Sequence, residues 1–243
     1  MAADRIVRAT AALLFLGSAA VTIACCSSMA DMAGMDMPGG WTMSMSWMRM
    51  PGQNWAQSTA GFVGMWAMMM VAMMLPSLMP ALRGYRFTNA AGFAAAYFGV
   101  WILAGVVIYP VGLGLAELEM RMPALARIVP EMAAATLAVA GIVQLSAWKA
   151  RQLDCCRSAP PCAMTTRGGW RRGITLGLRC CACCAPLTAA LLVAGVMDLG
   201  AMACATAAIS LERLAPRGPA IARITGALLI AAAGAALLGP LVA

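Results

Sequence analysis

The stretch Gly61-Phe-Val-Gly-Met-Trp-Ala-Met-Met-Met-Val-Ala-Met-Met-Leu-Pro-Ser-Leu-Met-Pro80 decides the fold of this chain. It runs for 20 residues without a charge, and about 20 apolar residues of α-helix cross the hydrocarbon core of a bilayer. Met65, Met69 and Met73 recur every four residues and share one helix face, with Met68 beside them. The stretch therefore predicts a transmembrane helix with thioethers along one face, which Pro76 and Pro80 kink or end.

The rest of the chain has the same character, with 63% hydrophobic and 11% charged residues in 243 positions. An ordinary soluble domain has roughly 25% charged residues, so that class is excluded. We predict an all-α fold, a polytopic membrane helix bundle of about seven transmembrane helices. The predicted spans are Ile6 to Cys25, Gly61 to Leu82, Ala91 to Glu117, Met132 to Trp148, Ile174 to Met197, Leu199 to Leu211 (the shortest) and Pro219 to Val242.

Basic residues indicate the orientation, because short loops rich in Lys and Arg stay in the cytoplasm. With the N-terminus inside and the C-terminus outside, only Arg49, Arg121 and Arg127 of the 17 basic residues lie outside. The net charge of +8 then reflects topology and attraction to anionic lipid. No basic patch interleaved with aromatic residues points to nucleic acid, so none is expected as a partner.

We divide the chain into a first transmembrane helix (1–26), an extracytoplasmic Met-rich loop (27–60) and a six-helix membrane domain (61–243). The first segment has an alternative interpretation as a signal peptide, because Ala24-Cys25 resembles a lipoprotein cleavage site. Cleavage would leave Cys25 as a lipid anchor and six spans. Thr22 stands where such a site takes a leucine-like residue, which favours a signal anchor that is retained.

Sulfur dominates the possible metal ligands, since 15 of the 22 methionines fall between Met29 and Met79 and the chain has no histidine. Thioethers and thiolates are soft donors that select Cu(I). In the loop, Met32, Met35 and Met37 are candidate ligands. The loop has little apolar sequence to pack, so we expect it to be mobile without a ligand. The alternative for the loop and the Met65 face is that methionine is an adaptable apolar filler.

The cysteines form a second candidate site, with Cys180, Cys181, Cys183 and Cys184 well inside the fifth span. Helical spacing lets two or three of these sulfurs face the bundle interior together, and a bound cation drives the proton off such a thiol. The alternative is that small cysteines pack helices. A cytoplasmic loop, Lys149 to Gly173, adds Cys155, Cys156 and Cys162 as possible acceptors of Cu(I). Cys25 and Cys26 lie beside the Met-rich loop and could take ions from it.

From Phe62 to Ala233 the chain resembles a bacterial family of predicted metal-binding integral membrane proteins that includes copper chaperones of tyrosinase-type oxidases. The resemblance rests on Met65-Trp66, Ala72 to Ser77, Tyr97 to Trp101, Ala140 to Gln144 with Lys149, Cys156-Arg157, the Cys180 to Cys184 cluster, Gly195 to Leu199 and Glu212. The chain departs from the family pattern at Gln152, Ala182 and Ala185, where cysteine, glycine and tryptophan are expected. The resemblance implies copper handling in a bacterial inner membrane.

Together these observations predict a membrane Cu(I)-binding protein, not an enzyme. It would gather Cu(I) at its Met-rich and Cys-rich sites and transfer the ion across or along the membrane, as a chaperone or transporter for copper enzymes. Its expected partners are the copper ion, the lipid bilayer and a copper-dependent membrane or periplasmic enzyme. Two alternatives stay open: a membrane thiol/disulfide oxidoreductase that uses a quinone, and an accessory subunit of a membrane copper enzyme. The chain has no phosphate-binding Gly-rich loop, which argues against ATP-driven pumping.

Overall fold

The structure, a computed structural model, describes residues 2–30, 34–48, 52–82, 87–157 and 166–238. It is 89% helical, which confirms the all-α class. The helices are α1 (Ala2–Ala30), α2 (Trp55–Leu82), α3 (Phe87–Arg121), α4 (Pro123–Leu145), α5 (Ala147–Arg157), α6 (Thr166–Gly195), α7 (Leu199–Leu214) and α8 (Gly218–Leu238). A short antiparallel hairpin, β1 (Met35–Met37) with β2 (Trp41–Met43), and the 3₁₀ turn η1 (Met45–Trp47) lie between α1 and α2.

Six helices of the described chain are long and apolar enough to cross a membrane: α1, α2, α3, α4, α6 and α8. Large apolar side chains such as Leu13, Leu103 and Leu228 stay 65–72% exposed on them, as expected where lipid is the solvent. Helix α7 coincides with the shortest predicted span and has 16 residues, about 24 Å of helix against a hydrocarbon core of about 30 Å. The count of seven crossings and the orientation stay predictions.

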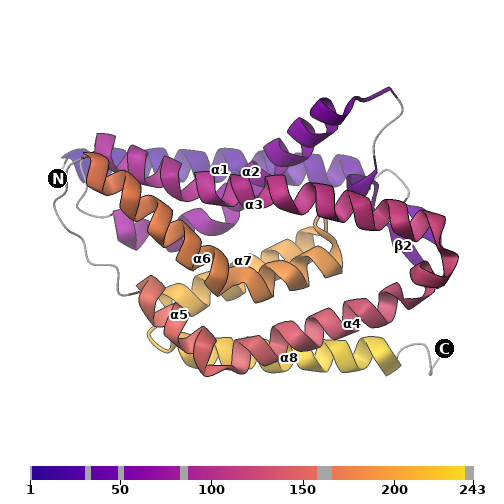
Figure 1. Cartoon of the computed structure of the whole chain (residues 1–243). Helices are drawn as coiled ribbons and strands as arrows, with labels where there is room; N and C mark the ends of the chain where they lie inside the picture. Colours follow the sequence, from indigo (N-terminus) through magenta and orange to yellow (C-terminus); the bar gives the residue numbers. More distant parts are fainter. Residues whose placement is uncertain (1, 31–33, 49–51, 83–86, 158–165, 239–243) are drawn as a thin grey trace.

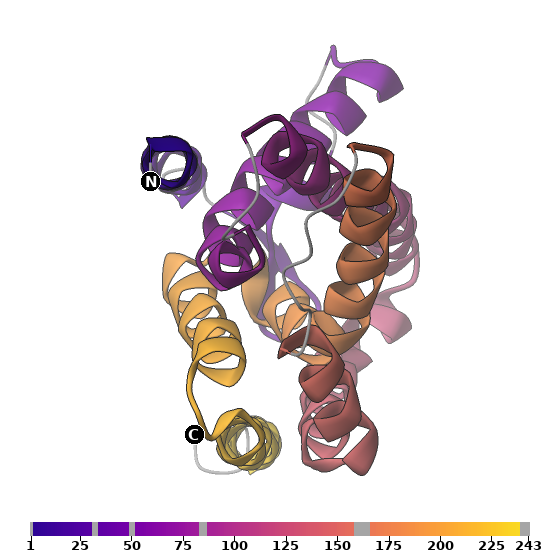
Figure 2. The same cartoon turned by 90° about the vertical axis from the view of Figure 1, so that its left-hand side faces the viewer.

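The long helices run back and forth between the two ends of the molecule, and the start of α1 and the end of α8 lie at opposite ends (Figure 1). Helices α1, α2 and α3 form one side, and α4 and α8 lie side by side along the other. Helices α6 and α7 lie between these two sides (Figure 2). The buried core accordingly joins α2, α3, α6 and α7.

Glycines on α6 let this helix approach α3 closely. A Cβ atom on Gly177 would lie 3.1 Å from the carbonyl oxygen of Tyr97, and one on Gly173 would collide with the carbonyl oxygen of Phe93. Small residues at helix contacts are the usual means of close approach in membranes. Gly173 and Gly177 lie seven and three residues before Cys180, on the same face of α6, so this contact also brings Cys180 against α3.

The Met-rich loop is more ordered than the sequence predicts. Residues 34–48 form the hairpin and the 3₁₀ turn, and Met37 and Met43 are buried in a small cluster with Ala116 and Ala126 of α3 and α4. The nitrogen Nε1 of Trp41 donates to the carbonyl oxygen of Ala126 at 2.9 Å. The expectation of a mobile loop is therefore wrong for these residues, because their methionines and tryptophans supply the apolar surface that was expected to be missing.

One further expectation about helix limits needs correction. Residues 149–157 and 166–173, expected within a cytoplasmic loop, belong to α5 and to the first turns of α6. Helix α5 packs against the bundle because it buries Leu153, Cys156 and the stem of Lys149. Helix α2 continues through Pro76 and Pro80 to Leu82, so the prolines do not end it, and the kink stays a prediction.

Candidate metal centre

Three of the four clustered cysteines point into the bundle. Cys180, Cys183 and Cys184 are no more than 2% exposed, whereas Cys181 is only partly buried. The Sγ atoms of Cys180 and Cys184 lie 3.7 Å apart, as expected for residues one helical turn apart. The helical spacing therefore produces the predicted convergence of sulfurs.

A guanidinium group contacts this pair directly. The Nη1 atom of Arg213, from α7, lies 3.0 Å from Cys180 Sγ and also donates to Ser77 Oγ of α2 at 3.0 Å and to the hydroxyl of Tyr97 of α3 at 3.3 Å. The Tyr97 hydroxyl donates in turn to Cys180 Sγ at 2.9 Å. A sulfur that accepts hydrogen bonds from a cation and a hydroxyl is in a setting that favours a thiolate, the form that binds metals.

Cys183 faces the other way, toward α5. It forms a small buried cluster with Leu153 and Cys156. The buried cysteines therefore extend from Cys180 and Cys184 at the centre of the bundle to Cys183 and Cys156, which pack together between α6 and α5.

A second buried cation, Lys149, lies beside Cys183. Its Nζ donates to the Cys183 carbonyl oxygen at 2.7 Å and forms a 2.8 Å ion pair with Glu212, both side chains being at most 2% exposed. Gln144 Nε2 also donates to Glu212, at 2.7 Å. Burial alone disfavours the ammonium, but Cys183 and Glu212 outweigh it, so the pKa of Lys149 is raised above its usual value and the residue stays charged.

The two cations differ in how their charges are balanced. Lys149 has the Glu212 carboxylate, whereas in the described chain the side-chain partners of Arg213 are Ser77, Tyr97 and Cys180, with no carboxylate among them. A buried charge without an opposite charge is very costly. The cysteine pair is therefore the place where the balancing negative charge belongs.

The sulfur geometry fits a soft metal ion. Two metal–sulfur bonds of about 2.3 Å, the length known for Zn–S, at a tetrahedral angle separate their sulfurs by about 3.8 Å. The 3.7 Å between Cys180 and Cys184 is close to this separation, so the pair suits an ion that is coordinated at an angle between the two sulfurs and takes a further ligand. Among the residues that the structure describes, no three cysteine, aspartate or glutamate side chains are already grouped as a metal site.

The chain matches one known family. The family PpoB2, described as a copper chaperone, matches residues 63–236. The chain belongs to this family. The match confirms the resemblance predicted from the sequence and contains every residue of the buried network, while α1 and the hairpin precede it. Comparisons with curated proteins and with solved structures find no match.

The methionines of α2 lie in the same core as the cysteines. Met69 and Met73 are 1% and 4% exposed and share a hydrophobic cluster with Cys180 and Cys184, whereas Met65 and Met68 are only partly buried. Met70 and Met74 are buried as well. The buried methionines thus cover a broader part of the α2 surface than the predicted face of Met65, Met69 and Met73.

Other predicted ligands lie apart from this centre. Cys155 is exposed on α5, Met35 is exposed on β1, and Met37 is packed in the hairpin cluster. Met32, with Cys162, falls outside the described residues. The buried cysteines of this centre are therefore Cys156 and three of the four clustered on α6, with Met69 and Met73 in the adjoining core.

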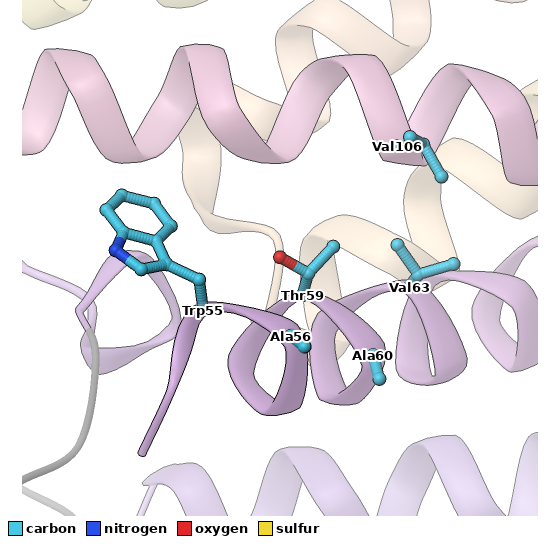
Figure 3. A pocket seen from close by; sticks show the side chains of 6 residues that line it. All are labelled: Trp55, Ala56, Thr59, Ala60, Val63 and Val106. Carbon is cyan, nitrogen blue, oxygen red and sulfur yellow. The ribbon is translucent and has the colours of Figure 1, made fainter. Parts of the chain in front are cut away.

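One surface groove is apolar and separate from the sulfurs. It lies at the start of α2 against α3, where Trp55, Ala56, Thr59, Ala60, Val63 and Val106 line it (Figure 3). Thr59 supplies the hydroxyl among the lining side chains, and no sulfur lines the groove. It offers a copper ion no soft ligand.

Sequence reasoning missed the role of the charged residues in this network. From the sequence alone, the basic residues, Arg213 and Lys149 among them, indicate topology, and Glu212 enters only as part of the family resemblance. Each falls at the margin of an apolar stretch, and ionisable residues in membrane segments mark functional sites. That signal could have identified Glu212 and Arg213, which end an otherwise uncharged helix α7.

Replacing Glu212 by glutamine should destabilise the protein strongly, because Lys149 would keep its charge in the core without a partner. Breaking a buried ion pair in this way costs about 3–5 kcal/mol. We expect Glu212→Gln to lower the midpoint of thermal unfolding in detergent, followed by circular dichroism. Asp154→Asn, at an exposed position of α5, is the matched control. Equal unfolding midpoints for the two variants would contradict the conclusion that Glu212 balances the buried charge of Lys149.

Proposed function

We propose that this copper chaperone carries Cu(I) as its cargo inside the membrane and holds the ion between Cys180 and Cys184. The observation that supports this most strongly is the pair of sulfurs 3.7 Å apart with the Arg213 guanidinium on one of them. The absence of histidine from the chain favours an ion that accepts a sulfur-only ligand set. Cysteine and methionine sulfurs together are soft ligands of the kind that Cu(I) prefers.

Charge balance supports the same assignment. Two thiolates and one Cu(I) ion carry a net charge of minus one, which the otherwise unbalanced Arg213 neutralises. Before loading, one thiolate on Cys180 beside a neutral Cys184 thiol carries the same net charge. Copper then replaces the Cys184 proton, which is released as expected when a metal binds a thiol. The total charge of the buried core does not change, so loading costs little electrostatic energy.

The methionine face of α2 gives a route to this site. Ser77 lies one turn beyond Met73 and contacts Arg213, which contacts Cys180. The buried column of Met69 and Met73 therefore ends where the cysteine pair begins. Conduction needs sites that bind an ion and also release it, and neutral thioethers are weaker ligands than thiolates.

Cys183 and Cys156 give a route away from the pair. Cys183 follows Cys181 and precedes Cys184 on α6 and packs against Cys156 on α5, and the adjacent Cys155 is exposed. Cu(I) passed from sulfur to sulfur would keep soft ligands throughout, so it need not be released as a bare ion in the core. In this proposal α5 is the side on which the chaperone hands over its cargo to a copper enzyme.

The affinity of the purified protein for Cu(I), measured by competition with a chromophoric chelator, tests the holding site. We expect the double variant Cys180→Ser/Cys184→Ser to bind at least about 100-fold more weakly, since even residues that only support a metal ligand contribute 10–100-fold. Cys204→Ser, at an exposed position on α7, should bind as the wild type does. An unchanged tight site in the double variant would overturn the assignment and favour a redox or accessory role for these thiols.

The proposed route makes a separate prediction about rate. Leucine has nearly the volume of methionine, and such exchanges usually cost less than about 1.5 kcal/mol in stability. Met69→Leu/Met73→Leu should therefore keep the fold and the tight Cu(I) affinity but slow Cu(I) entry into reconstituted vesicles that contain a Cu(I) indicator. Leu75→Met, a change of the same size in the same helix, is the control. Equal entry rates for the wild type and the double variant would exclude the methionine route.

A further inference from the structure

A second sulfur pair lies where α1 and α6 end, outside the centre described above. The Sγ atom of Cys26, near the end of α1, lies 3.9 Å from the Sδ atom of Met197, which stands two residues after the last residue of α6. These residues are 171 positions apart in the sequence. Helix α1 runs from the N-terminus toward the end of the molecule that carries the Met-rich hairpin (Figure 1), so the pair is on the hairpin side.

The surroundings of this pair contain polar groups with unusual environments. Cys26 is 2% exposed and has Cys25 beside it. Asp198 follows Met197 directly in the chain and caps α7 by accepting a hydrogen bond from the Ala201 backbone N–H. Thr22, one turn earlier on the same face of α1, is 7% exposed, and its Oγ1 has no hydrogen-bond partner. Buried polar atoms without a partner are rare and indicate an additional occupant such as an ion or water.

We propose that Cys26 and Met197 form a second Cu(I) site, through which the ion enters or leaves the bundle; this rests on the proposed function above. The 3.9 Å between the sulfurs is close to the separation of about 3.8 Å expected for two sulfur ligands of one ion. When Cu(I) binds, the Cys26 S–H bond breaks, a copper–thiolate bond forms and the proton leaves to water. The copper keeps its oxidation state, so no oxidant or reductant is required.

The two sites differ in charge and therefore in strength. One thiolate, one neutral thioether and one Cu(I) ion form a neutral complex, which needs no buried cation such as Arg213. One thiolate also binds Cu(I) less tightly than two, so this site exchanges copper more readily than the Cys180–Cys184 pair. Nearby Asp198 adds an attraction for an arriving cation. Helix α1 precedes the residues that match the family, so this chain would add the site to the shared copper chaperone core.

Copper titrations can separate this inference from the proposed function. The purified full-length wild type and its variants are titrated with Cu(I) against a competing chelator. The variants are Cys26→Ser, Met197→Leu, Cys180→Ser/Cys184→Ser, the triple variant Cys26→Ser/Cys180→Ser/Cys184→Ser, and Cys204→Ser as the control. We expect Cys26→Ser and Met197→Leu each to lose one weaker Cu(I) equivalent and keep the tight one. The Cys180→Ser/Cys184→Ser variant should lose the tight equivalent and keep the weaker one. The triple variant should lose both equivalents.

The possible failures are distinct. If Cys26→Ser binds as many Cu(I) ions as the wild type and Cys204→Ser, the second site does not exist, while the proposed function stands. If the Cys180→Ser/Cys184→Ser variant keeps the tight Cu(I) equivalent, the proposed function fails instead.

A labelling measurement guards against a folding defect in Cys26→Ser. Cu(I) should protect Cys26 in the wild type from a membrane-permeant thiol reagent, as followed by mass spectrometry of the peptide that contains it. Met197→Leu keeps the Cys26 thiol and nearly the same packing volume, so we expect this variant to lose most of the protection, about tenfold or more. Equal protection in the two proteins would overturn the pairing of Cys26 with Met197.

Discussion

One buried guanidinium group holds the centre of this molecule together. Arg213 extends from α7 to Ser77 on α2, Tyr97 on α3 and Cys180 on α6, so a single side chain joins the four helices that form the core. A positive charge in such a place requires an anion. The pair of sulfurs beside it meets that requirement with a thiolate or with a copper–thiolate complex, and the proposed function follows from this constraint.

Lys149, the second buried cation, differs from Arg213 because its charge is already balanced. Arg213 is therefore the cation that we relate to the Cu(I) cargo. Lys149 is neutralised by Glu212, and this closed pair fixes α5 and α7 against the cysteine helix through the Cys183 carbonyl oxygen. This ion pair is neutral overall, and its role is to stabilise the packing of the helices. The close approach of α6 to α3 at Gly173 and Gly177 then sets Cys180 beside Tyr97. Packing and charge together thus position the sulfurs before any ion arrives.

The sequence predicts the helices and the sulfurs well, because both depend on local patterns. Apolar runs indicate the spans, and helical spacing indicates that Cys180 and Cys184 converge. The contacts of Arg213 join residues up to 136 positions apart, and no local pattern reports such a pairing. Helix α5 was missed for a related reason: its sequence is polar, and it is held by the burial of Lys149 and Leu153 in the bundle. The order of the Met-rich hairpin likewise depends on a distant surface at Ala116 and Ala126.

X-ray absorption at the copper edge of the Cu(I)-loaded protein tests the central claim most directly, because it reports which atoms bind the ion. The account predicts a shell of sulfur alone, at about 2.3 Å, for the tight equivalent in the wild type. It also predicts that this shell gains oxygen neighbours in Cys180→Ser/Cys184→Ser. A wild-type shell that contains nitrogen or oxygen, or a sulfur shell unchanged in that variant, would contradict it.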